Sequence, residues 1–215
     1  MNAARRARRA YRGAPFGDRF HVALRWRTCP FRAVEDVLPR KGRILEIGCG
    51  HGLFSLYLAA ASPDRTVVGV DVDDSKLAVA RAATTALGAH SVSFEAREAL
   101  EALSEPWAGI AIVDVLYLLG ADPARAVLKA AAEHVEPGGV LAVKEIDLVP
   151  RWKYRLAHAQ ELVATKVLRI TEGEKVDFLP PADAIGVMED AGLHVETRRV
   201  DRGYPYPHLL IVGRA

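Results

Sequence analysis

From about residue 40 to residue 145, the chain alternates between two patterns of hydrophobic and polar positions. Short runs of consecutive apolar residues predict buried strands, and the segments between them have the apolar spacing of amphipathic helices. The expected strands are residues 43–47, 66–70, 91–94, 110–115 and 140–145. This rhythm predicts an α/β fold with a doubly wound parallel sheet and helices on both of its faces.

Capping and turn residues predict where the helices begin and end. The N-caps expected for helices that begin near residues 19, 74 and 123 are Asp18, either Asp73 or Asp74, and Asp122. Gly88 is expected to end the second of these helices. The sequence Pro137-Gly138-Gly139 is expected to turn the chain into the strand at 140–145.

The two ends of the chain depart from this rhythm. Residues 1–14 carry five arginines and no acid, which predicts a mobile arm or a solvated helix. After residue 150 the pattern predicts a long basic amphipathic helix at 152–170, a helix at 181–191, and strands at 194–200 and 209–212. We therefore expect one domain over 1–215. Its expected parts are an N-terminal arm with cap helices (1–40), a cofactor-binding core (41–148), a helical cap (149–192) and a terminal β-hairpin (193–215).

Glycines cluster where the first expected strand ends. Residues 43–53 read Arg-Ile-Leu-Glu-Ile-Gly-Cys-Gly-His-Gly-Leu, a buried strand that runs into a glycine turn with a helix after it. Glycine lets backbone N–H groups approach a ligand without a side chain in the way. Asp71 ends the next apolar strand about 20 residues on, the spacing at which a carboxylate grips a ribose. The pattern predicts an enzyme with a nucleoside cofactor.

The spacing of the glycines separates two classes of cofactor. A dinucleotide fingerprint is G-x-G-x-x-G, whose third glycine allows close packing beside a pyrophosphate. Here the glycines are Gly48, Gly50 and Gly52, and Leu53 occupies the place of that third glycine. Because the pyrophosphate cradle is incomplete, a nicotinamide or flavin enzyme is the weaker alternative.

The segment Leu45-Glu46-Ile47-Gly48-Cys49-Gly50-His51-Gly52 resembles motif I of the class I S-adenosylmethionine (SAM) dependent methyltransferases. Further motifs follow in the family's order, so the resemblance covers roughly residues 40–145. It implies a methyltransferase with SAM as its cofactor. It also implies a seven-stranded, mostly parallel sheet whose last strand is inserted antiparallel.

The resemblance assigns roles to residues at the strand ends. Glu46 would help to hold the methionine ammonium of SAM, Asp71 would accept both ribose hydroxyls, and Asp114 would lie beside the methionine tail. Glu98 stands where the family has an acid for the adenine amino group, although an ordinary first-turn helix acid is an equal alternative. The family more often has Gly-Asp-Ala where this chain has Arg97-Glu98-Ala99. The full expected cofactor set is Glu46, Gly48, Cys49, Gly50, Gly52, Asp71, Val72, Glu98, Ala99 and Asp114.

Methyl transfer is an in-line displacement at the sulfonium carbon, in which an enzyme supplies mainly proximity and orientation. An oxygen or nitrogen acceptor also calls for a general base. The candidates are Tyr117, Glu145, Asp147 and His208. Each has a plainer alternative: Tyr117 as a core residue, the two acids as surface ion-pair partners, and His208 as a solvated turn residue.

Composition indicates the class of protein and its compartment but not the reaction that it catalyses. Half of the 215 residues are hydrophobic, a quarter are charged and the net charge is +2, which is ordinary for a soluble globular protein. The two cysteines, Cys29 and Cys49, have no metal-ligand spacing, so no metal is expected and a reducing cytoplasm suits the chain. The basic N-terminus lacks the apolar region of a secretory signal, and no apolar run is long enough to span a membrane.

Three functions remain open at this point. The first is methylation of a small-molecule acceptor, aromatic or lipid-linked, by an enzyme whose basic segments touch an anionic membrane surface. The second is an RNA or protein methyltransferase; the lack of an Asn-Pro-Pro-Tyr-type motif and of a broad basic surface argues against nucleic acid. The third is a non-catalytic SAM-binding module. Nothing in the sequence sets the oligomeric state.

Overall fold

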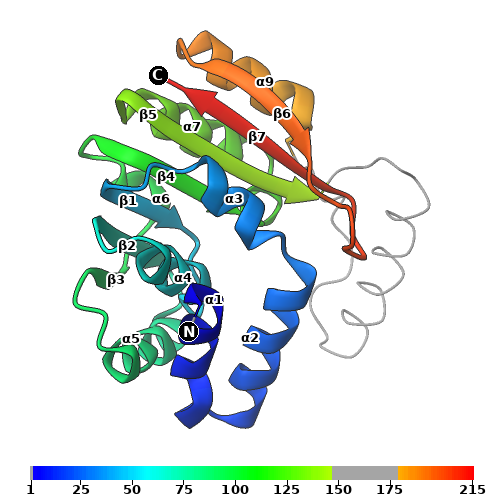
Figure 1. Cartoon of the computed structure of the whole chain (residues 1–215). Helices are drawn as coiled ribbons and strands as arrows, with labels where there is room; N and C mark the ends of the chain where they lie inside the picture. Colours follow the sequence, from blue (N-terminus) through cyan, green and yellow to red (C-terminus); the bar gives the residue numbers. More distant parts are fainter. Residues whose placement is uncertain (1, 147–178) are drawn as a thin grey trace.

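We describe a computed structural model of the chain over residues 2–146 and 179–215. The helix expected at 152–170 lies outside these residues. The strands form one seven-stranded sheet in the order β3-β2-β1-β4-β5-β7-β6 (Figure 1). Their bounds are β1 Gly42–Ile47, β2 Arg65–Asp71, β3 Val92–Ala96, β4 Trp107–Val113, β5 Val135–Ile146, β6 His194–Arg199 and β7 His208–Arg214.

The strand directions confirm the expected sheet. Strands β3, β2, β1, β4 and β5 are parallel, and β7 runs antiparallel between β5 and β6. From β1, the chain builds β2 and β3 to one side and then crosses to β4 and β5 on the other. In such sheets the ligand site lies outside the carboxyl ends of the strands where the order reverses, here β1 and β4.

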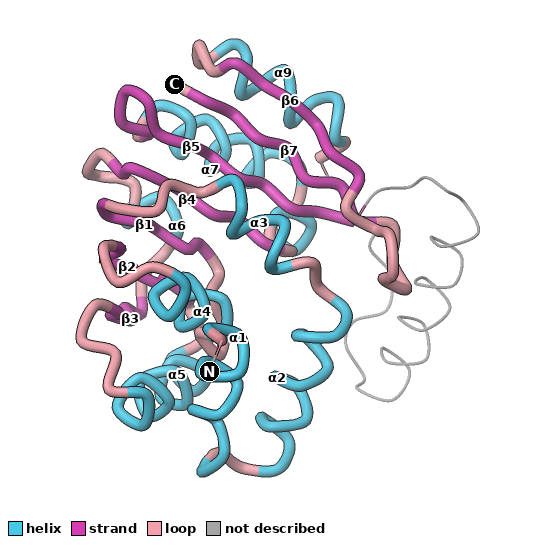
Figure 2. Tube along the Cα trace, in the orientation of Figure 1, coloured by secondary structure: helices cyan, strands magenta, loops and turns pink. Residues whose placement is uncertain are grey.

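Helices cover both faces of the sheet, as Figure 2 shows. Their bounds are α1 Ala3–Arg9, α2 Phe16–Thr28, α3 Phe31–Val37, α4 Leu53–Ala61, α5 Asp74–Leu87, α6 Ala99–Ala102, α7 Ala121–Glu133 and α9 Pro181–Asp190, with short 3-10 helices η1 Ala10–Gly13 and η2 Leu116–Leu118. Alternate residues of each strand face opposite layers. Ile44 packs in the core with α3, α4 and α5, whereas Leu45 packs in the core with α6, α7 and α9. No helix in the described ranges is both long and apolar enough to cross a membrane.

The expectation of a mobile arm or solvated helix at residues 1–14 is wrong. Helix α1 and η1 pack on α4 and α5, with Ala4, Ala7 and Tyr11 buried (Figure 1). The buried residues recur at the spacing of one helix face. The arginines occupy the other faces, and their charge masks this stripe of small residues in the sequence.

Two of the expected N-caps are also wrong. Helix α2 has Pro15 as its N-cap and α7 has Gly120, so Asp18 and Asp122 lie inside the first turns. There the two carboxylates still interact favourably with the positive end of the helix dipole. Asp73 is the N-cap of α5 as expected, and its side chain accepts hydrogen bonds from two backbone N–H groups.

The segment 137–139 is part of β5 rather than a turn before it. The pairing of β5 with β4 shifts register there, between Trp107 and Gly109. The N–H of Gly138 donates to the carbonyl of Ala215, and the N–H of Ala215 donates to the carbonyl of Gly139. Because the last residue continues the hydrogen bonding of the strand, proline and glycine are tolerated at this irregularity.

Candidate active site

The chain between β1 and α4 makes a tight turn with three glycines in the left-handed region. Their φ angles are 69° at Gly48, 52° at Gly50 and 72° at Gly52, which residues with side chains rarely adopt. A Cβ at Gly48 would lie 2.4 Å from a methyl carbon of Val115, and one at Gly52 would lie 2.4 Å from the ring of Phe94. Both conformation and space therefore require glycine at these two positions.

Asp71, the last residue of β2, is tied directly to this turn. Its Oδ2 accepts a 2.8 Å hydrogen bond from the N–H of Gly50, and its Oδ1 accepts one of 3.0 Å from the N–H of Asp73. Asp71 is not the N-cap of the helix that follows, because Asp73 caps α5. Each carboxylate oxygen has a second lone pair, so Asp71 is oriented and can accept further hydrogen bonds.

Glu46 is buried near the end of β1, where its carboxyl accepts a hydrogen bond from Oγ of Ser55 in α4. Burial raises the pKa of Glu46 to about 7, although the hydrogen bond from Ser55 opposes the rise. A solvated surface carboxylate is therefore excluded. A cation beside this group would favour its ionised form, which is the behaviour needed of a residue that holds an ammonium.

Asp114 follows β4 with φ at 58°, and no other non-glycine residue in the described ranges has a positive φ. Its carboxylate, 7% exposed, accepts a 2.6 Å hydrogen bond from Nη1 of Arg25 and another from Nζ of Lys144. Burial alone would raise the pKa of Asp114, but the two cations outweigh it and lower the pKa to about 2. Asp114 is thus a buried anion held between two cations in a backbone conformation common at functional sites.

The two partners of Asp114 are functional candidates that the sequence analysis missed. Arg25 is one of several arginines in α2, and nothing in the sequence separates it from the others. Lys144 carries a usable sequence signal, because it directly follows the apolar run 140–143 of an expected buried strand; in the structure its side chain is 0% exposed. A charged residue in a buried strand needs a partner of opposite charge, and Asp114 is the acid directly after the neighbouring strand β4.

These groups surround a cleft of about 610 Å³ at the carboxyl ends of β1, β2 and β4. Every residue of the expected cofactor set except Gly52 contributes to its lining. The rest of the set therefore meets at one place in the fold. Lining residues outside the expected set include Arg25, Phe31, His51, Lys76 and Arg97.

The N-terminal helices close one side of this cleft. The hydroxyl of Tyr11 donates a 2.6 Å hydrogen bond to the carbonyl of His51 in the glycine turn. Nε2 of His51 lies 3.2 Å from a carboxylate oxygen of Asp18, and the rings of His21 and His51 have centroids 4.7 Å apart. Burial together with the neighbouring His51, Arg25 and Lys76 lowers the pKa of His21 to about 4, so the ring is neutral near pH 7.

Cys49 lies within the turn and lines the same cleft, but its environment does not activate it. Burial, with the nearby carboxyls of Glu46 and Asp71, raises the pKa of the Cys49 thiol. A nucleophilic cysteine needs the opposite shift, toward the thiolate. The thiol therefore packs in the turn, and the contribution of Cys49 to a ligand site comes through its backbone.

Among the base candidates, Tyr117 in η2 lines the cleft, whereas Glu145 and His208 do not. Oε1 of Glu145 accepts hydrogen bonds from the N–H groups of Val115 at 3.2 Å and Leu116 at 3.0 Å. Burial and the charge of Asp114 raise the pKa of Glu145 to about 8. Glu145 is therefore not the surface ion-pair partner that the sequence left as an alternative, and Asp147 lies outside the described residues.

His208 is the first residue of β7 and is buried rather than solvated in a turn. Its Nε2 lies 2.6 Å from the carbonyl oxygen of Thr28 at the end of α2. Burial and the nearby charge of Lys144 lower the pKa of His208 to about 4. A neutral ring that donates to this carbonyl joins the terminal strand to the helix that carries Arg25.

Comparison with known proteins shows similarity to methyltransferases in part of the sequence. Residues 44–139 match the family described as methyltransferase domain. Over 39 residues, 18% of this chain, the sequence is 49% identical to uncharacterized phycocyanin operon protein W of Pseudanabaena tenuis, of which the match covers 37%.

Two solved structures share the fold. An O-methyltransferase family protein from Burkholderia thailandensis superimposes with a TM-score of 0.72 at 21% identity, over 93% of this chain and 58% of its own. The magnesium protoporphyrin IX methyltransferase of Synechocystis, solved with bound SAH, superimposes with a TM-score of 0.65 at 17% identity, over 86% of this chain and 82% of its own. This chain thus spans little more than half the length of the first. Residues 44–139 are thus similar to the methyltransferase domain family, and the described part of the chain has the fold of these two methyltransferases.

Proposed function

We propose that this protein transfers the methyl group of SAM to a small-molecule acceptor, aromatic or lipid-linked. The observation that carries the proposal is the meeting of the glycine turn, Asp71 and Asp114 in one cleft at the strand ends. The residues fit SAM, because Gly48 at the cleft wall has no space for a side chain, so the backbone stays accessible there, and Asp71 is oriented by two backbone donors. When bound, SAM supplies an electrophilic methyl group on its sulfonium.

The residues of the cleft have separate proposed tasks. Asp71 accepts the ribose hydroxyls, and Glu46 balances the ammonium of the amino-acid tail. Val72, Glu98 and Ala99, at the cleft wall beyond β2, enclose the adenine. Asp114 acts through Arg25, because the ion pair fixes the guanidinium at the cleft wall, where it can bind the tail carboxylate.

For the acceptor's proton we propose Tyr117 as the catalytic base, since it alone among the described candidates lines the cleft. Glu145 is then a positioning residue. Its carboxyl accepts from two consecutive backbone N–H groups, one just before η2 and one in it, and so orients the turn that carries Tyr117. Asp147 and His208 stay in the candidate set, and the position of His208 behind α2 supports an indirect role.

The test is transfer of a tritiated methyl group from SAM to a panel of phenols, carboxylic acids, amines, a total lipid extract, total RNA and total protein. We expect transfer to one of these classes, and Tyr117→Phe is expected to lower kcat at least about tenfold with unchanged affinity for S-adenosylhomocysteine (SAH). Tyr57→Phe, on α4 and outside the cleft lining, is the matched control. Tight SAH binding with no transfer to any acceptor would favour the non-catalytic module, and transfer only to RNA or protein would favour the second alternative.

Peripheral contact with an anionic membrane is the second part of the proposal. Phe16, Phe20 and Leu24 recur at intervals of four along α2 and are 80%, 61% and 48% exposed. A row of exposed apolar residues beside arginines is the composition of a helix that lies on a lipid surface. Sedimentation with vesicles of phosphatidylcholine and phosphatidylglycerol tests it: Phe16→Ser with Phe20→Ser should abolish co-sedimentation, and unchanged binding would rule the contact out.

We also propose that the chain works as one domain in the cytoplasm. Both Cys29 and Cys49 are free and buried in the described part of the chain, which suits a reducing compartment. Limited proteolysis tests the single domain, which should yield one protected core rather than two. Fractionation of the source cells tests the compartment.

A further inference from the structure

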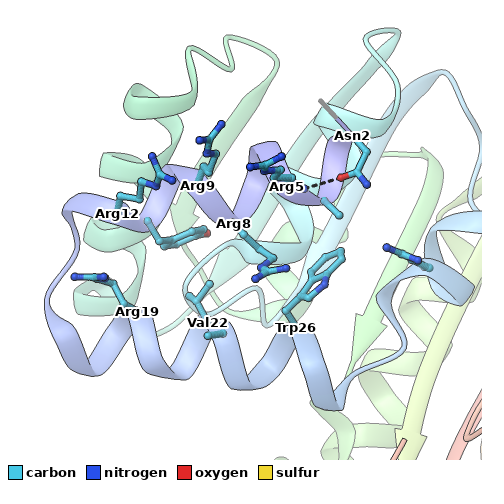
Figure 3. Close-up of a pocket in the computed structure, with 12 residues that line it drawn as sticks. Asn2, Arg5, Arg8, Arg9, Arg12, Arg19, Val22 and Trp26 are labelled. Carbon is cyan, nitrogen blue, oxygen red and sulfur yellow. Dashed lines mark hydrogen bonds between the residues drawn. The ribbon is translucent and has the colours of Figure 1, made fainter. Parts of the chain in front are cut away.

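A second cavity, of about 530 Å³, lies between α1 with η1 on one side and α2 on the other (Figure 3). We call it the arginine groove. Its arginines come from four helical segments of the N-terminal part of the chain, α1, η1, α2 and α3. They are Arg5, Arg8, Arg9, Arg12, Arg19 and Arg32.

In the described part of the chain, the lining of the arginine groove supplies no negative charge to offset that of its arginines. None of the described residues that line it is an aspartate or glutamate. Within the described ranges, Arg8, Arg12 and Arg19 form no ion pair with a carboxylate, unlike Arg25, which is paired with Asp114. Guanidinium groups stay charged at every accessible pH, so their convergence is unfavourable until an anion offsets it.

The arginine groove presents these charges from two sides of a fixed frame. Figure 3 shows Arg8 directed from α1 toward α2, with Val22 and Trp26 rising from α2, and Arg12 and Arg19 at one end of the groove. Tyr11 also lines the groove; it is buried, and its hydroxyl donates a hydrogen bond to the carbonyl of His51, which ties η1 to the glycine turn. The exposed arginine side chains can therefore reorient around a ligand while the helices that carry them stay packed on the fold.

The arginine groove is separate from the cofactor cleft. Helix α2 is the wall between them: Val22 lines both cavities, while Arg25 faces the cleft and Arg19 faces the groove. SAM carries no phosphate, and its ribose, adenine and tail are provided for in the cleft. The arginines of the groove are therefore not needed to bind the cofactor.

We propose that the arginine groove binds a ligand with two or more phosphoryl groups. The planar guanidinium of arginine binds phosphoryl oxygens through two parallel hydrogen bonds. A single carboxylate could make such a pair with only one guanidinium, whereas several phosphoryl groups could pair with several. Six guanidinium groups around one cavity match a cluster of phosphoryl charges. Such a cluster occurs on a soluble polyphosphorylated molecule and on the head groups of an anionic lipid surface.

The experiment is calorimetric titration of the full chain with inorganic tripolyphosphate at constant ionic strength. The groove variant is Arg8→Gln with Arg12→Gln and Arg19→Gln, all exposed side chains whose loss leaves the core intact. The control variant makes the same change of net charge at Arg43, Arg125 and Arg198, which form exposed ion pairs elsewhere. We expect the groove variant to weaken tripolyphosphate binding at least about tenfold and the control variant to leave it nearly unchanged.

A parallel arm identifies the source of the phosphoryl groups. Vesicles of phosphatidylcholine with phosphatidylglycerol that bind the native chain, release it to tripolyphosphate and fail to bind the groove variant would assign the ligand to lipid head groups. Binding of tripolyphosphate alone would assign it to a soluble molecule. SAH is titrated separately, so that failure of the groove and failure of the cofactor site are told apart.

Three results would overturn the proposal. The first is absence of tripolyphosphate and vesicle binding to the folded native chain. The second is equal weakening in the groove and control variants, which would reduce the effect to net charge. The third is binding of a single-stranded oligouridine far more tightly than tripolyphosphate and dependent on the same arginines, which would make the groove an RNA surface.

Discussion

The backbone N–H of Gly50 donates a 2.8 Å hydrogen bond to Oδ2 of Asp71, which joins the glycine turn after β1 to the end of β2. The other oxygen of this carboxylate accepts from the N–H of Asp73. Asparagine has one acceptor oxygen, so Asp71→Asn would turn an amide NH₂ toward one of the two donors. We expect Asp71→Asn to lower the free energy of unfolding by about 1–3 kcal/mol in urea titration. Asp74→Asn, at an exposed position, should change it little, and equal losses would contradict the orienting role of the turn.

Alanine substitutions at Gly52 and Gly88 distinguish the cost of backbone strain from the cost of steric overlap. Both have left-handed φ angles, 72° and 66°, but a Cβ at Gly52 would meet Phe94 and Ala80, whereas one at Gly88 would meet open space. Gly88→Ala should cost about 1–2 kcal/mol of unfolding free energy from the backbone alone. Gly52→Ala should cost about 1–3 kcal/mol more because the core must shift. Thermal and urea unfolding measure both, and similar losses would show that the turn has room.

The ion pairs of Asp114 predict a specific loss of stability in acid. The cations that lower its pKa to about 2 in the fold are absent in the unfolded chain, where the pKa is about 3.9. A lowered pKa stabilises the fold above the unfolded value, and this contribution is lost as the pH falls from about 4 to about 2. The expected amount is on the order of 2 kcal/mol. Unfolding free energy measured across this range should fall more steeply in the native protein than in Asp114→Asn, and parallel curves would contradict the pairing.

Glu145 predicts a pH dependence of the opposite sign. Its pKa is raised to about 8 in the fold, against about 4.3 in the unfolded chain, so the folded state holds a proton that the unfolded state releases. Its contribution is therefore present below about pH 4 and lost as the pH rises toward about 8. Gln in this place keeps the single oxygen that accepts from Val115 and Leu116. The stability of Glu145→Gln relative to the native protein should rise between about pH 4 and 8, and a constant difference would show that the carboxyl is ionised throughout.

Local sequence patterns predicted the parts of the site that lie next to the strands in the chain. The strand, the glycines and Asp71 are close in sequence, and the order of strands follows from the βαβ rhythm. Nine of the ten expected cofactor residues line one cleft for this reason, the exception being Gly52. The boundaries of the expected helices were less accurate, because proline and glycine set the caps of α2 and α7 where acids were expected.

Contacts between distant segments were beyond the reach of the sequence. Arg25 and Asp114 are 89 positions apart, and their ion pair depends on how α2 crosses the end of β4. The arginines of residues 1–14 were interpreted as a sign of solvation. In the structure four of the five border a cavity, because the alanines between them pack on α4 and α5. Periodicity predicts which face of a helix is buried but not which other helix faces its polar side.

The most direct test of the cofactor site is calorimetric titration of the native protein and of Asp71→Ala with SAM, SAH and NAD. We expect SAM and SAH to bind the native protein in the micromolar range, with at least about a tenfold loss in Asp71→Ala and no binding of NAD. Circular dichroism confirms that each protein is folded. Binding of NAD but of neither SAM nor SAH to the folded native protein, or SAH binding that is unaffected by Asp71→Ala, would contradict the assignment of this cleft to SAM.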